Sequence, residues 1–232
     1  MINKNEFVEI EFTAKVKDGE IFDTNIPEQA KKLGFKEQVK PLIISVGNNM
    51  VIKGLDNSIP NKEIGKDYSD EFSPENAFGN RDKNLVRMIP MRFFKEQNIY
   101  PQRGLTLSLD GMIARIISVS GGRVLVDFNN PLAGKIIIYN YKINKKVEDI
   151  NEKINSLQDF LFKQRFEFSV KDKIITFKIP SQIEPILKLF EKQFNEILGM
   201  DIKTEITEEK KEKPEEKKKA GVKVSEQIED KN

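Results

Sequence analysis

The sequence predicts an α+β protein whose main antiparallel sheet is built from two distant segments, with another unit inserted between them. Residues Phe7–Val16 and 135–147 both alternate apolar and polar side chains, as half-buried strands do. The segment between them contains a β pattern of its own, and a helical spacing of apolar residues starts only after residue 147. With 232 residues, the chain is long enough for about one to three compact units.

The first 84 residues are expected to form short strands separated by turns. The alternation breaks at Asp18-Gly19 and resumes at Ile21, which is typical of a hairpin. Residues 25–40 are polar and are expected to be a connection. The expected elements are strands at Phe7–Val16, from Ile21, at Pro41–Val46 and at 66–73, and a helix at Met50–Ile59 that Pro60 and Gly65 end.

Residues 85–128 predict a second, small β unit. Two of its strands are joined through Gly121-Gly122, and the leucines of the segment 105–109 alternate. The expected strands are Leu85–Ile89, 105–109, Met112–Val119 and Arg123–Phe128. Because residues 135–147 would complete a sheet with residues 1–16, this β unit is expected to be an insertion.

The last part of the chain predicts a third unit and a charged tail. Residues 148–206 combine a helix over Val147–Phe162, two short strands around Lys171-Asp172-Lys173, and one amphipathic helix from Ile183 to Leu198. Residues 207–232 alternate Glu and Lys with few apolar side chains, so they are expected to be disordered.

Composition excludes several kinds of chemistry. The chain has no His and no Cys, which excludes disulfides, thiol or Ser-His nucleophiles and nearly all zinc sites, so we expect no metal and no cofactor. With 39 basic and 37 acidic residues, the net charge of +2 argues against nucleic acid or a membrane as partner. No leader pattern or apolar run of roughly 18 residues is present, so we expect a cytoplasmic protein.

A set of short motifs then follows in a specific order and spacing. They are Phe12-Thr13-Ala14, Asp18-Gly19, Ile21-Phe22-Asp23-Thr24, Gly47, Met50-Val51-Ile52-Lys53-Gly54-Leu55, Glu63-Ile64-Gly65-Lys66 and Pro74-Glu75-Asn76-Ala77-Phe78-Gly79. Over about residues 4–80 the set resembles the FKBP family of peptidyl-prolyl cis-trans isomerases. The segment Asn130 to Lys135 with Ile138-Tyr139 is similar to the N-x-x-L-A-G-x-x-L-x-F closing motif of the SlyD-type branch, which carries a domain inserted in the flap.

The resemblance implies an FKBP-like antiparallel half-barrel sheet wrapped on a short helix, and it assigns the units in the manner of the long archaeal-type form. Residues 1–84 plus 129–147 would be the isomerase domain, 85–128 an insert-in-flap chaperone domain, and 148–206 an extra α+β domain with a possible role in dimerisation. Metal binding by the SlyD-type tail is not carried over, because that property depends on a His-rich tail that is missing here.

The resemblance also implies a pocket with apolar walls and one charged member, Asp23. Its catalytic positions would be Asp23, Phe22, Phe12, Phe78 and Tyr139, and its substrate-binding positions Leu42, Val51, Ile52, Leu55 and Leu132. By analogy, the N–H of Ile52 holds a substrate carbonyl and Asp23 orients the site. Taken singly, these apolar residues are ordinary core residues and Asp23 is a turn or capping residue, so the interpretation depends on their joint order.

Such a pocket suits rotation about an X-Pro bond, whose barrier is roughly 18–20 kcal/mol, because no atom need be attacked or deprotonated. The planar amide is more polar than the twisted one, so an apolar pocket that removes water favours twisting. Three residues depart from the family pattern: Phe12 and Phe78 where Tyr is usual, and Leu55 where Trp is common. A lost flap hydroxyl removes a hydrogen bond worth about 0.5–1.5 kcal/mol.

Three functional interpretations stay open. The first is an isomerase that is also a chaperone for unfolded or partly folded proteins and proline-containing peptides. The second is a holdase or assembly module with a weak or vestigial pocket. The third is a structural protein that acts mainly through oligomerisation of its C-terminal domain, with the FKBP-like part as an adaptor. The apolar residues Met88, Met91, Phe93, Phe94 and Met112 fit either a small core or a client-binding surface. The stripe Ile183 to Leu198 fits a core or the interface of a homodimer.

Overall fold

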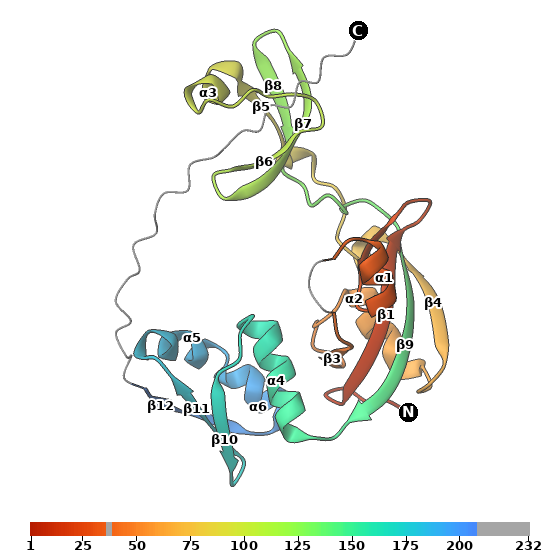
Figure 1. Ribbon diagram of the computed structural model, residues 1–232, viewed down its shortest axis with the longest axis vertical. Coiled ribbons are helices and arrows are strands. Elements are labelled where there is room, and N and C mark those ends of the chain that lie inside the picture. Colours follow the sequence, from red (N-terminus) through yellow and green to blue (C-terminus); the bar gives the residue numbers. More distant parts are fainter. Residues whose placement is uncertain (36–38, 208–232) are drawn as a thin grey trace, which may run out of the picture.

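The computed structural model describes residues 1–35 and 39–207, and their secondary structure forms three sheets. Figure 1 shows that the sheet formed by residues 86–127 is joined to the rest of the molecule by two linkers. This confirms the α+β class. The expectation of a charged tail at 207–232 falls almost wholly outside the described residues. No helix within the described ranges is long and apolar enough to cross a membrane.

The first sheet has five strands, in the order β2-β1-β9-β4, with β3 pairing with the other half of β1. Its strands are β1 (Phe7–Val16), β2 (Ile21–Thr24), β3 (Leu42–Ser45), β4 (Asp67–Phe72) and β9 (Ile137–Val147). β1 and β9 pair antiparallel along their whole length, as the alternation in both segments predicted. Residues of the second sheet therefore lie between β4 and β9 in sequence, although these two strands are direct neighbours.

One face of this sheet packs on α2 (Lys53–Ser58) and the 3₁₀ turn Ile59–Asn61. Alternate residues of β1, from Val8 to Ala14, and alternate residues of β9, from Ile137 to Ile143, are buried there together with Leu55 and Ile59. The period of two in both strands brings these side chains to one face, where burial stabilises them. The candidate functional residues pack in or against this core.

Two helical expectations in the first unit need correction. The helix expected at Met50–Ile59 begins only at Lys53, because its N-cap residue Ile52 has a non-helical backbone with ψ 145°, and Val51 before it lies in a bend. The polar connection 25–40 contains a helix, α1 (Pro27–Lys32). Pro at its first position, Glu28 in its first turn and two lysines in its last turn are ordinary helix signals.

The second sheet, in the order β5-β8-β7-β6, forms a unit with a core of its own. Its strands are β5 (Val86–Pro90), β6 (Thr106–Leu109), β7 (Met112–Ser120) and β8 (Arg123–Asp127). The sequence did not predict α3 (Met91–Glu96), which follows Pro90 directly and places Phe94 at the centre of that core. We call residues 85–128 the insert.

The third sheet contains β10 (Glu167–Lys171), β11 (Ile174–Ile179) and β12 (Asp201–Ile206), and β12 runs parallel to β11. The helices of this unit are α4 (Ile150–Leu161), α5 (Glu184–Leu189) and α6 (Glu191–Leu198). The single helix expected from Ile183 to Leu198 is divided at Phe190, and β12 was not foreseen. Phe190 packs edge-on against Phe162, with ring centroids 5.4 Å apart.

The core of the third unit extends into the first sheet. Phe7 of β1 and Val147 of β9 are buried in it, and Met50 packs against both this core and the core below the pocket. Asn5 also donates a hydrogen bond of 2.9 Å to the carbonyl of Glu196 in α6. The first and third units are therefore joined by shared side chains as well as by the chain itself.

Candidate active site

The candidate site is built on three neighbouring strands. Ala14 of β1 is in register with Asp23 of β2 on one side and with Tyr139 of β9 on the other. Residues paired in this way point to the same face of a sheet. Ala14, the small residue in register with both of them, is fully buried.

A bulge in β2 places Phe22 at this site. Ala14 pairs with Asp23, but the next residue of β1, Lys15, pairs with Ile21, so Phe22 is the extra residue. In a regular strand, adjacent side chains point to opposite faces, whereas a bulge redirects one of them. Phe22 accordingly packs against the same core as Tyr139.

Aromatic rings pack together at the candidate site. The ring of Tyr139 lies 5.4 Å from that of Phe12 and 6.1 Å from that of Phe72, measured between centroids. Phe22 and Phe78 meet edge to face at 5.8 Å. Phe72 was not among the residues expected here. Its position in β4 next to β9 explains its presence, because it pairs with Ile137 two residues from Tyr139.

The segment before α2 supplies another side of the site. The buried carboxylate of Asp56 accepts hydrogen bonds from the N–H groups of Gly47 at 2.7 Å and Asn49 at 2.8 Å. This side chain ties the turn to the helix, and Val51 and Ile52 follow the turn. No described residue accepts a hydrogen bond from the N–H of Ile52, so that donor is free for a ligand.

Asn25 fixes the strand that carries Phe12. Its side-chain oxygen accepts a hydrogen bond from the N–H of Phe12 at 2.7 Å, and its amide donates to the carbonyl of Ile10 at 2.9 Å. Thr24 adds a hydroxyl that donates to the carbonyl of Phe12 at 2.8 Å. Asn25 is 7% exposed, so these bonds lie out of reach of bulk water. No pattern in the sequence indicated this role of Asn25.

Charge in the site is concentrated on Asp23. The residue is exposed at its surface side, but partial burial of the carboxyl group raises its pKa above the ordinary value of 3.8, against the effect of the Thr24 N–H. Burial also raises the pKa of the Tyr139 hydroxyl, and the negative charge of Asp23 raises it further. Tyr139 therefore stays protonated at neutral pH and is a hydrogen-bond donor.

The hydroxyl of Tyr139 forms no hydrogen bond with any residue in the described part of the chain. The family motif quoted above has Phe at its last position, so this site has gained one hydroxyl, although Phe12 and Phe78 lack theirs. The gain was not recognised from the sequence. A free donor beside an apolar pocket is suited to a substrate carbonyl.

A charged network supports the pocket from the side of β4. Lys62 bonds Asp70, with 2.8 Å between Nζ and Oδ2, and the hydroxyl of Tyr141 donates to Asp70 at 2.8 Å. Burial opposes ionisation, but the hydrogen bonds from Lys62 and Tyr141 prevail and lower the pKa of Asp70. The Lys62 ammonium also lies 4.5 Å from the centre of the Tyr68 ring.

Seven of the nine apolar residues expected in the pocket belong to one cluster, namely Phe12, Phe22, Val51, Ile52, Leu55, Phe78 and Tyr139. Leu42 and Leu132 do not. Leu42 pairs with Ile10 at the outer edge of the sheet and lines a groove of about 740 Å³ that α4 shares. Leu132 is half-buried in the turn before β9.

Comparison with known proteins identifies the family of this chain. The family model described as "FKBP-type peptidyl-prolyl cis-trans isomerase" matches residues 1–92, and the model "FKBP26, IF domain" matches residues 87–132. A short-type peptidyl-prolyl cis-trans isomerase of Methanocaldococcus jannaschii is 33% identical over 146 residues, which are 62% of this chain and 92% of that protein.

Two bacterial relatives are similar over the same extent. The FKBP-type isomerase SlyD of Aeromonas hydrophila is 26% identical over 59% of this chain and 60% of its own length. The FKBP-type 16 kDa isomerase of Escherichia coli is 26% identical over 61% of this chain and 91% of its own length. The chain belongs to the FKBP-type peptidyl-prolyl cis-trans isomerase family. It is an isomerase of the SlyD-like kind, and its additional unit fits an insert-in-flap arrangement.

Proposed function

We propose that this protein accelerates the rotation of X-Pro bonds in folding chains, with the pocket around Tyr139 as the catalytic surface. The observation that supports it is that Phe12, Phe22, Phe78 and Tyr139 belong to one apolar cluster, with Asp23 close enough to act on the Tyr139 hydroxyl through its charge. The prolyl ring enters between the aromatic walls, where water is excluded and the less polar, twisted amide is favoured. No covalent step is needed, so the rings, the free donors and one carboxylate suffice.

Each polar group has a defined task in this proposal. The N–H of Ile52 binds the carbonyl on one side of the prolyl residue, and the hydroxyl of Tyr139 binds a second carbonyl in place of the hydroxyl that Phe78 lacks. Asp23, on the other side of Ala14, orients this hydroxyl through its charge. Leu55 is the floor of the pocket, and Val51 lies beside it. The metal-free and cofactor-free mechanism stays a prediction.

The test is isomerisation of a short prolyl peptide by wild type and by Tyr139→Phe. Loss of one substrate hydrogen bond predicts a fall in kcat/KM of about two- to tenfold, from about 0.5–1.5 kcal/mol. The matched control is Tyr100→Phe, which removes a hydroxyl from an exposed tyrosine of the insert. Equal rates for Tyr139→Phe and wild type would exclude the hydroxyl from catalysis, and absence of isomerisation in wild type would reject the pocket altogether.

We further propose that the insert holds unfolded chains near the pocket, as a chaperone domain. The insert has a core, centred on Phe94, and it still exposes Met88 and Ile113 by 59% and 65%. Met112, Tyr100 and Leu105 are exposed as well. The apolar residues of the insert thus divide between a small core and a surface. Flexible apolar side chains on a surface suit the binding of many different chains.

This proposal predicts different effects of the insert on large and small substrates. The two linkers at the ends of the insert are joined by hydrogen bonds. The N–H of Asp82 donates to the side-chain oxygen of Asn129, and the amide of Asn129 donates to the carbonyl of Asp82. Residues 83–128 can therefore be replaced by a short Gly linker. The deletion should slow proline-limited refolding of a protein far more than isomerisation of a short peptide, because the insert raises the local concentration of the chain.

The alternative is a holdase with a vestigial pocket, and the absence of two hydroxyls and an indole at Phe12, Phe78 and Leu55 supports it. It predicts suppression of aggregation without isomerisation of either substrate. The same pair of assays separates the two functions.

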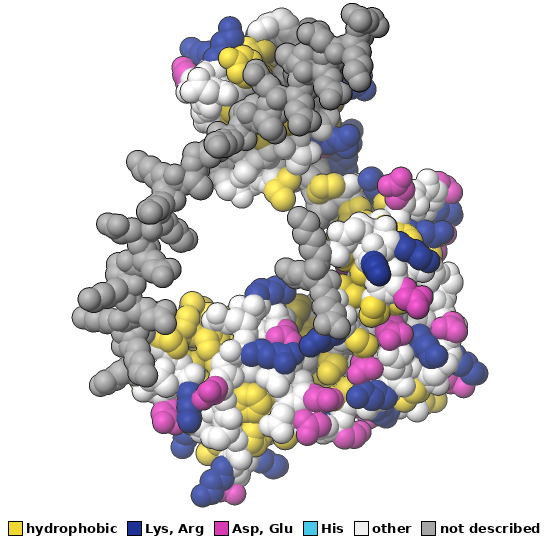
Figure 2. Space-filling view, viewed as in Figure 1, with side chains coloured by type: hydrophobic (Ala, Val, Ile, Leu, Met, Phe, Trp, Pro, Cys, Tyr) yellow, Lys and Arg dark blue, Asp and Glu magenta, His cyan; other side chains and the backbone are white. Residues whose placement is uncertain are grey.

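A homodimer through the C-terminal unit is also proposed. Leu189 and Ile186 of α5 and Ile206 of β12 are exposed, and Figure 2 shows hydrophobic side chains gathered over α5. Light scattering of wild type and Leu189→Ser tests this association. A cytoplasmic location, and the absence of nucleic acid and membrane partners, stay predictions from the sequence.

A further inference from the structure

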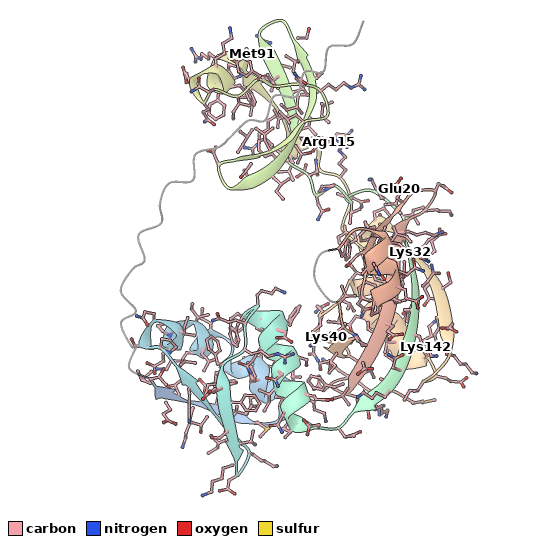
Figure 3. All side chains as sticks on the ribbon, viewed as in Figure 1. Glu20, Lys32, Lys40, Met91, Arg115 and Lys142 are labelled. Carbon is pink, nitrogen blue, oxygen red and sulfur yellow. The ribbon has the colours of Figure 1, made fainter. Side chains whose placement is uncertain are left out.

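A cleft of about 220 Å³ lies where the insert meets the two linkers. One side is the outer face of the insert sheet, with Ile113, Arg115 and Ile117 of β7. The other side is the linkers, with Arg81 on one and Pro131, Ala133 and Lys135 on the other. Arg115 extends from the part of the insert nearest the linkers (Figure 3). The cleft thus combines exposed aliphatic side chains with the ends of long cationic ones.

The cleft has an excess of positive charge. Arg81, Arg115 and Lys135 line it, and Asp127 is its one acidic lining residue. Asp127 is already paired with Arg81. Arg115 and Lys135 form no ion pair with any residue in the described part of the chain. Two cations in the cleft are therefore available to a ligand, whereas the whole chain is almost neutral.

The cleft is also close to the prolyl pocket along the chain. Phe78 is a wall of the pocket, and Arg81 follows it by three residues, which limits the distance between their Cα atoms to about 11 Å. Gly79 lies between them, and its carbonyl accepts a hydrogen bond of 2.8 Å from the N–H of Gly134, the residue before Lys135. A substrate chain leaving the pocket past Phe78 passes this junction before it reaches the insert.

We propose that this cleft is a specificity subsite for an extended substrate segment in which an acidic side chain stands next to a bulky aliphatic one. The acidic group pairs with Arg115 and Lys135, and the aliphatic group contacts Ile113 and Ile117. The inference rests on the proposed function, because it names the kind of client that the pocket and the insert hold together. Alternating apolar and charged contacts favour a polypeptide over a nucleic acid, whose phosphates would leave the isoleucines without partners.

The experiment measures the affinity of full-length protein for a set of 15-residue labelled peptides by fluorescence anisotropy. Each peptide has one Leu-Pro bond and one Leu, placed at a varied distance from the proline and followed by Glu, Gln or Lys. At the distance that reaches the cleft, we expect the Glu peptide to bind about three- to tenfold more tightly than the Gln peptide, and the Lys peptide to bind most weakly. Added salt should reduce the preference, because both cations are exposed.

Variants test which residues cause the preference for the Glu peptide. The double variant Arg115→Gln/Lys135→Gln should bind Glu and Gln peptides equally, whereas Arg92→Gln, which removes an exposed cation of α3, should keep the wild-type ratio. The conservative pair Arg115→Lys/Lys135→Arg keeps both charges and should keep the preference, which guards against a folding defect of the double variant.

Three results would overturn the subsite. They are equal binding of Glu and Gln peptides to wild type at every spacing, a preference that survives the double variant, and binding of a short RNA as tight as that of the Glu peptide. Isomerisation of a prolyl tetrapeptide by wild type is measured in the same series. Its absence would reject the proposed catalytic function, and it would leave the charge preference of the cleft to be judged by the binding data.

Discussion

Asp23 and Tyr139 lie on opposite sides of Ala14, each in register with it on a neighbouring strand, and the charge of Asp23 adds to burial in raising the pKa of the Tyr139 hydroxyl. The carboxylate thus acts on the hydroxyl across one small buried residue. Asp23 and Tyr139 are polar groups beside an otherwise apolar cluster, and in the proposed mechanism their protonation states determine how the site binds a substrate carbonyl.

The dependence of kcat/KM on pH should show the titration of Asp23. The pKa of Asp23 is raised above 3.8, the ordinary value for an aspartate. As the pH falls, Asp23 therefore loses its charge earlier than an ordinary aspartate does. If the charged form orients the site, kcat/KM for a short peptide should fall on this acid limb in wild type. Asp23→Asn should be about two- to tenfold slower at neutral pH and should lack the limb. Asp18→Asn, in the adjacent turn, is the control, and a limb that persists in Asp23→Asn would contradict the assignment.

Gly54 is expected to tolerate no side chain. A Cβ atom there would overlap the ring of Phe72, with 2.8 Å to its Cγ, and would lie 3.0 Å from the carbonyl oxygen of Asn76. Gly54→Ala should therefore destabilise the fold by about 1–3 kcal/mol and raise KM, because the displaced Phe72 ring contacts Tyr139. Asn57→Ala, on the exposed side of the same helix, should be neutral or slightly stabilising. Urea unfolding and peptide kinetics measure both, and an unchanged Gly54→Ala would refute the packing.

Asp70 should contribute stability that is lost in acid. Because its folded pKa is lowered, the contribution is complete above the unfolded value of about 3.8 and disappears as the pH falls through the folded value. Asp70→Asn should cost about 1–3 kcal/mol at pH 7, since Lys62 and Tyr141 lose their partner. The difference from wild type should shrink as the pH falls below 3.8. Asp67→Asn, exposed on the same strand, gives the baseline. A difference that is independent of pH would exclude the ion pair as its cause.

Asn25 should matter for both stability and catalysis. Asn25→Ala leaves the N–H of Phe12 and the carbonyl of Ile10 without partners in a buried place, at a cost of about 1–3 kcal/mol for each unpaired group. Chemical denaturation should show this loss, and the isomerisation rate should fall because Phe12 moves. Asn140→Ala, exposed on β9, controls for loss of an amide in the same sheet. Wild-type stability in Asn25→Ala would show that water replaces the lost bonds.

Much of the site could be predicted because its motifs occur in a fixed order. Phe12, Phe22, Leu55, Phe78 and Tyr139 lie in motifs from both ends of the isomerase sheet, and the structure brings them into one cluster. The pairing of β1 with β9 could also be predicted, because the alternation of apolar and polar residues in both strands is a property of the sequence itself.

The parts that escaped prediction depend on contacts between distant residues. The bulge at Phe22 is set by pairing with Ala14 and Lys15, and the hydrogen bonds of Asn25 replace ladder bonds that no local pattern encodes. The helix expected from Ile183 to Leu198 is divided at Phe190, which packs on the distant Phe162, although the apolar spacing alone continues through this position. Leu42 and Leu132 were assigned by motif position, and both lie outside the cluster because they flank the sheet edge and a turn.

Phe7 and Val147, on two strands of the first sheet, are buried in the core of the third unit, and Met50 packs against the cores of both units. We therefore expect the two cores to melt together and to show matching amide protection in hydrogen exchange. The core around Phe94 shares no residue with either of them among the described residues, so the insert should open by itself, at lower cost. We therefore expect the insert, the proposed client-binding unit, to fluctuate and even to unfold locally while the candidate active site keeps its shape.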